Sequence, residues 1–205
     1  MIRRILVLAT VVALLGATVS AAGASPWETE DVFGQGPNGD TVASNGAKIN
    51  RGSNGITAKV TMPTPEPGSY TYPEGPTASG EEGRPEAFSL WVFVFFNPEA
   101  CDGACDASDL ATNPAVVAGA FNAGGHLVTG PNLTISGRVT EQNPTFGPPD
   151  FAETIAEALD QDYEIADAEV HLAVAPHGAL APELLPSQIK TPAGGPADWW
   201  LAIFE

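Results

Sequence analysis

The chain has 205 residues, and its 25 acidic and 8 basic side chains give a formal net charge of −17 at pH 7. One domain is the expectation for this length. The excess of negative charge argues against nucleic acid and anionic membrane surfaces as partners. It suits an extracellular or saline setting, or cation binding, and specifies none of them.

Residues 1–24 have the pattern of a secretory signal peptide. Arg3 and Arg4 form a charged start, residues 5–19 an apolar core, and residues 22–24 an A-x-A cleavage site. The core is short for a bilayer span, which needs about 20 residues. We therefore expect cleavage near Ala24 by the general secretion route. The product would be secreted or periplasmic, with no membrane span after cleavage.

Residues 25–54 are rich in Gly, Asn, Asp and Ser and have few apolar side chains. This composition predicts a flexible N-terminal arm. The folded domain is expected over residues 55–205. It opens with an alternating, half-buried strand over residues 55–62. Residues 63–86 hold six prolines, which predicts a long loop.

Leu90–Phe96 is an unbroken apolar run of mostly aromatic and β-branched residues, and Asn97-Pro98 ends it. This composition favours a strand over a buried helix. A run that is apolar at every position predicts burial on both faces. We expect it to be the central strand of the domain.

Cys101 and Cys105 follow in an acidic loop, four positions apart with Gly103 between them. Cysteines of an exported protein are expected to be oxidised, so we predict a Cys101–Cys105 disulfide. A redox pair is a weaker interpretation, because the spacing is C-x-x-x-C. A zinc site would need at least two further ligands.

The same loop carries four carboxylates, at Glu99, Asp102, Asp106 and Asp109. Clustered oxygen ligands suit Ca²⁺, which makes these residues a candidate calcium site. The spacing matches no EF-hand, and a solvated acidic loop explains the same pattern. We favour the solvated loop.

Further strands are predicted over residues 115–121, 126–128, 133–139, 168–175 and 199–204, with turns at 122–125 and 176–178. A D-x-x-E capping box at Asp150 predicts a short helix to about Asp160. Together these elements predict a mostly β fold. We expect an Ig-like or Greek-key β-sandwich of about seven strands with one short helix.

The chain has only three histidines, His126, His171 and His177, and Glu169 shares a strand face with His171. A β-sandwich can gather such side chains from strands and loops into a Cu or Zn site. They would then serve a metal carrier or a dismutase-like enzyme. Alternatively, all three are structural polar residues, since His-x₅-His is no recognised ligand spacing.

Other chemistries have less support in the residues. The chain has no G-x-S-x-G, P-loop or G-x-G-x-x-G sequence, so neither a nucleophile elbow nor nucleotide binding is indicated. Adjacent strand residues point oppositely, so one of Trp199 and Trp200 is expected to face outward or cover a loop. An exposed Trp would suit a carbohydrate-binding module.

Three stretches carry a resemblance: FVFFNPEAC with a second cysteine, GH after a small-residue strand, and AEVHL followed by HG. In these the chain resembles a family of exported bacterial proteins without a known activity, over about residues 55–204. It is also distantly similar to CHRD-type secreted β-sandwich domains. The resemblance implies a secreted β-sandwich and assigns no catalytic residue.

The sequence therefore predicts a secreted, non-catalytic protein for extracellular binding or structural interaction. Its partner would be an extracellular protein or a glycan. The two alternatives are the Cu- or Zn-binding protein and the carbohydrate-binding module. No cofactor is certain, with Cu, Zn and Ca as the candidates.

Overall fold

The computed structural model describes residues 26–36, 39–52, 55–73, 85–128, 130–140 and 163–205. The signal-peptide prediction and the predicted helix after Asp150 lie outside these residues. The strands are β1 (Glu28–Gln35), β2 (Thr41–Gly52), β3 (Gly55–Pro63), β4 (Glu86–Phe95), β5 (Ala118–Val128), β6 (Asn132–Val139), β7 (Glu169–Ala179) and β8 (Trp200–Phe204). One α-helix is described, α1 (Ala107–Thr112). The 3₁₀ helices are η1 (Pro98–Ala100), η2 (Pro182–Leu184), η3 (Ser187–Ile189) and η4 (Pro196–Asp198).

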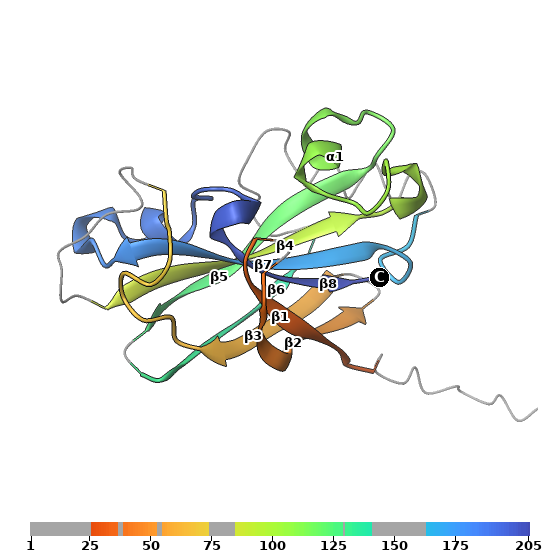
Figure 1. The fold of residues 1–205 in the computed structure, drawn as a ribbon. Helices are drawn as coiled ribbons and strands as arrows, with labels where there is room; N and C mark the ends of the chain where they lie inside the picture. Colours follow the sequence, from red (N-terminus) through yellow and green to blue (C-terminus); the bar gives the residue numbers. More distant parts are fainter. Residues whose placement is uncertain (1–25, 37–38, 53–54, 74–84, 129, 141–162) are drawn as a thin grey trace, which may run out of the picture.

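The mostly β fold predicted from the sequence is confirmed. The eight strands form one antiparallel sheet in the order β5-β4-β7-β8-β1-β2-β3-β6. Its two ends, β5 and β6, contact each other, and β4 contacts β6 across the interior. The sheet therefore curls into a nearly closed barrel, with β1–β3 beneath β4 and β7 in Figure 1.

The barrel ends meet at Gly137 of β6. A Cβ atom at this position would lie 1.7 Å from the carbonyl oxygen of Ala123 in β5. No side chain fits at that distance, so glycine is required for the two backbones to approach.

Strand β4 is buried on both faces, as predicted from its composition. Val92 aligns with Leu172 of β7, which aligns with Ala202 of β8, and this row belongs to the main core. The alternate row consists of Phe93, His171 and Ile203. Side chains alternate along a strand, so the second row faces away from the first.

The prediction of a flexible arm over residues 25–54 is wrong. Strands β1 and β2 lie there, and β1 pairs with both β2 and β8. Val32, Ala47 and Ile49 are buried in the core. Few apolar residues are enough to form these strands, because only some positions of β2 are buried. The hydrogen bonds between strands join backbone groups, which every residue except proline supplies in full.

Buried Arg51 fastens this N-terminal hairpin to the rest of the barrel. Its guanidinium pairs with Glu28 at 2.9 Å. It also donates to the carbonyl oxygens of Ala168, just before β7, and Phe204, at the end of β8. An arginine presents several donors in a fixed fork, which allows one side chain to join three segments.

Both predicted turns are wrong in the same way, because each lies inside a continuous strand. Gly124 in β5 has φ +141° and lies at a register shift between β5 and β4. Gly178 in β7 has φ +70° and lies next to a second shift. Both strands continue past an irregularity, because glycine accommodates a β-bulge as readily as a turn.

Barrel closure at Gly137 can be tested with a single methyl group. Gly137→Ala should lower the free energy of unfolding by about 1–3 kcal/mol, because the added Cβ forces β5 and β6 apart. Gly130→Ala is the matched control, since a Cβ there meets nothing within 4 Å. Urea unfolding followed by circular dichroism measures both variants. Equal stabilities would contradict the close approach.

Candidate functional site

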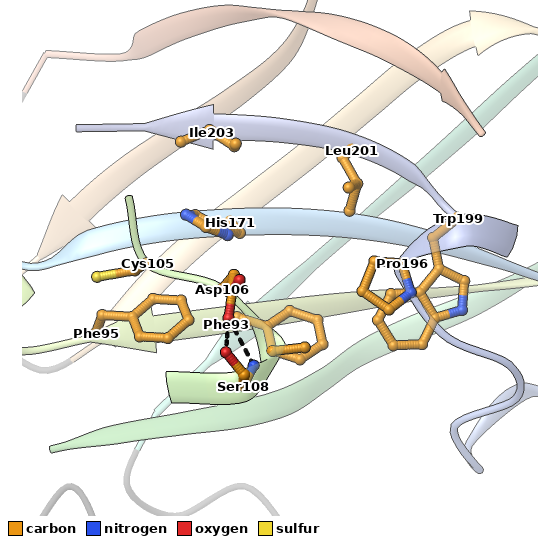
Figure 2. Close-up of a pocket in the computed structure, with 11 residues that line it drawn as sticks. Phe93, Phe95, Cys105, Asp106, Ser108, His171, Pro196, Trp199, Leu201 and Ile203 are labelled. Carbon is orange, nitrogen blue, oxygen red and sulfur yellow. Dashed lines mark hydrogen bonds between the residues drawn. The ribbon is translucent and has the colours of Figure 1, made fainter. Parts of the chain in front are cut away.

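A cavity of about 200 Å³ lies on the outer face of β4, β7 and β8, shown in Figure 2. It is mostly apolar, with a few polar groups toward one wall. The lining residues are Phe93, Phe95, Cys105, Asp106, Ala107, Ser108, His171, Pro196, Trp199, Leu201 and Ile203.

Strand register builds the floor of this cavity. Phe93 of β4 aligns with His171 of β7, which aligns with Ile203 of β8. Leu201 projects from the same face of β8, two residues before Ile203. Paired positions of adjacent strands point to the same side of a sheet. The floor is thus a row of side chains on the rigid part of the fold.

The loop after β4 forms one wall. The predicted disulfide between Cys101 and Cys105 is present, with the sulfur atoms 2.07 Å apart. The Asn97 side chain closes the base of the loop, donating to the Ala115 carbonyl and accepting from the Val117 amide. Buried Cys105 packs against Phe95 of the floor. The disulfide therefore anchors this wall to β4.

The four predicted calcium ligands do not form a cage. Asp106 and Asp109 make the capping box of α1, and Asp109 is buried, where it accepts from the amides of Asp102 and Asp106. Glu99 and Asp102 are exposed. The carboxylates of Asp106 and Asp109 both accept hydrogen bonds from backbone amides, and these bonds account for their positions.

Trp199 forms the opposite wall, after η4. Its ring lies 5.6 Å from that of Phe93, and its Nε1 donates to the carbonyl of Ala193 at 2.7 Å. Trp200 points the other way and packs against Tyr70 with ring centroids 5.3 Å apart. Both tryptophans are less than a tenth exposed. The structure thus offers no open stacking platform for a sugar at this pair.

Two polar pairs lie at the side of the cavity near α1, and all their members except Glu169 line it. His171 Nε2 donates to Glu169 Oε1 at 2.5 Å, and both side chains are about nine-tenths buried. Asp106 is exposed at the rim and accepts from the Ser108 hydroxyl at 2.6 Å. Hydrogen bonds from the Ser108 hydroxyl, and then from its backbone N–H, lower the pKa of Asp106. Asp106 is therefore an anion at neutral pH.

The structure does not bring the three histidines together. His171 lies in the cavity beside Glu169, and His126 is exposed on β5. His177 is fully buried and 2.8 Å from the Ser89 hydroxyl, which also accepts from Trp91 Nε1. Among the described residues, no three His, Cys, Asp or Glu side chains are placed to hold a metal ion. Of the predicted metal ligands, only His171 and Glu169 meet.

The buried Ser89–His177 pair resembles part of a hydrolase site. Ser89 and His177 are both 0% exposed, and the adjoining Trp91 is 1% exposed. The side-chain amide of Gln188 donates hydrogen bonds to the backbone carbonyl oxygens of His177 and Ala179. A substrate has no access to this pair, so its role is to satisfy polar groups inside the fold.

Sequence reasoning missed most of the cavity. The sequence predicts Phe93 and Phe95 only as members of a buried strand, and Leu201 and Ile203 only as members of the last strand. One feature of the sequence does point to the cavity: Leu90–Phe96 carries large apolar side chains at successive positions, so both faces of the strand are apolar. One of these faces points into the barrel. The other must be covered by segments outside the sheet, and the cavity lies between those segments and the sheet.

Comparisons with protein-family models, curated proteins and solved structures found no match. The resemblance to exported proteins and to CHRD-type domains therefore stays a prediction. Within the part of the chain that the structure describes, none of the helices is long and apolar enough to span a membrane.

The disulfide can be tested through its effect on the stability of the protein. Replacing Cys101 and Cys105 together by Ser should destabilise the protein by about 2 kcal/mol, the loop-closure value for so short a ring. Urea unfolding gives the free-energy difference. Wild-type protein in excess reductant should unfold like the double variant. Two reactive thiols in the native, unreduced protein would contradict the bridge.

Proposed function

We propose that the chain is an exported, non-catalytic binding protein that holds a small, largely apolar ligand in the cavity between α1 and Trp199. The signal-like residues 1–24 and the disulfide support export. The observation that carries binding is the cavity itself, with apolar walls and a few convergent polar groups. Ligand sites in proteins commonly have this character.

The polar groups of the cavity support binding rather than catalysis. A nucleophilic hydroxyl needs a base within hydrogen-bond reach. Ser108 carries the one hydroxyl among the lining side chains, and its partner Asp106 is a weak base because hydrogen bonds lower the pKa of that carboxyl. His171 donates to Glu169, and among the described residues no hydrogen bond joins it to Ser108. Neither pair therefore supplies an activated nucleophile.

The cavity volume indicates the size of the group that can be buried in it. A dry protein cavity of about 150 Å³ lined by apolar side chains accommodates benzene. The 200 Å³ described here therefore suits a group of about one aromatic ring with a short substituent. Phe93, Phe95 and Trp199 offer rings for such a group to pack against.

Toluene is a suitable first probe, since it has the size and apolarity of the cavity without a charge. Wild-type protein should bind it saturably, with an affinity measurable by ligand-observed NMR and a rise in melting temperature. Ala107→Trp should weaken binding at least tenfold, because Ala107 lies exposed on the cavity wall and the larger ring occupies the space.

Ala111→Trp is the matched control, an exposed position of the same helix outside the cavity. It should bind toluene like the wild type. Absent binding, or equal binding by the Ala107 and Ala111 variants, would contradict the proposed function.

A further inference from the structure

The cavity combines aromatic walls with an anionic rim. Phe93 and Trp199 lie with ring centroids 5.6 Å apart at an interplanar angle of 34°, and Phe95 lies along the same strand. The faces of aromatic rings carry negative partial charge and attract cations. Apolar contact and attraction of positive charge therefore occur in the same space.

Asp106 supplies the anion. Its Oδ1 atom accepts from the Ser108 amide and hydroxyl, both at 2.6 Å, and from the Asp109 amide at 3.3 Å. Among the described residues, no hydrogen bond to its Oδ2 atom is found. These contacts fix the carboxylate at the rim while leaving one oxygen for a ligand. Figure 2 shows this side chain beside His171 and above the row of aromatic rings.

An anionic ligand is disfavoured by the same contacts. The amides of Ser108 and Asp109 at the start of α1 already bond to Asp106, so they are not offered to a ligand. The Nε2 donor of His171 is already engaged by Glu169 Oε1 at 2.5 Å, so it is not offered to a ligand either. The whole chain, at −17, repels anions further.

We propose that the cavity selects small organic cations: an ammonium group pairs with Asp106, and an apolar body of about one ring lies against Phe93, Phe95 and Trp199. This ligand class rests on the proposed binding function and narrows it. Charge complementarity at the rim and burial of the apolar body act together, as is usual for ammonium recognition by aromatic side chains.

Three probes of the same shape separate charge from size: benzylammonium, benzyl alcohol and benzoate. Calorimetric titration of the wild type should give benzylammonium a three- to tenfold tighter dissociation constant than benzyl alcohol. Benzoate should bind more weakly than either. The preference for the cation is limited because Asp106 is exposed to solvent and its charge is partly screened.

Asp106→Asn is the decisive variant, because asparagine is an equally good N-cap and keeps α1 intact without the charge. In this variant the preference for benzylammonium over benzyl alcohol should disappear. Asp102→Asn is the matched control. It removes the same charge from an exposed position of the same loop outside the cavity, and it should keep the preference.

The outcomes separate the two proposals. Saturable toluene binding without a preference for benzylammonium would overturn the cation proposal and leave the binding function standing. A preference that Asp106→Asn retains, or that Asp102→Asn loses equally, would show attraction by the overall charge, and this too would overturn it. If toluene, benzylammonium, benzyl alcohol and benzoate all fail to bind, the binding function and the cation preference are both overturned.

Discussion

The outer face of β4, β7 and β8 is the constraint on which the rest of the structure depends. A strand with large apolar residues at every position cannot leave either face in water, since each exposed aromatic ring forfeits a few kcal/mol of burial. The barrel interior covers one face. Within the part of the chain that the structure describes, two non-strand segments cover the other face: the disulfide loop with α1, and residues 180–199 with η2–η4. The cavity lies where these two covers meet.

Barrel closure holds the floor of the cavity in place. Without β1, strand β8 would have no partner on its other side, because Phe33 and Gln35 pair with Leu201 and Trp200. Arg51 then joins β2 to the ends of β7 and β8. A segment with few apolar residues thus supports β8, the strand that carries two of the cavity's apolar residues. Rigid elements of this kind position a binding site more accurately than loops do.

Features with a local cause were predictable from the sequence. The strands at residues 55–62 and 133–139 followed from alternation, the Cys101–Cys105 bridge from spacing and export, and the Glu169–His171 pair from a two-residue spacing on a strand. Features that depend on tertiary contacts were not predictable from the sequence. Gly124 and Gly178 permit bulges as readily as turns, and only the neighbouring strands decide between them. The cavity required knowing how two loops far apart in sequence meet over one sheet face, which no local pattern contains.

The most direct test is to map the ligand onto the structure. Methyl-resolved NMR spectra of the protein should be recorded during a titration with benzylammonium. The account predicts saturable shifts at Leu201 and Ile203 on the cavity floor, and none at Ile49 and Ile56, which are buried in the barrel core. Shifts at Ile49 and Ile56 with none at Leu201 and Ile203, or no saturable shift at any methyl group, would contradict a ligand site between the two loops.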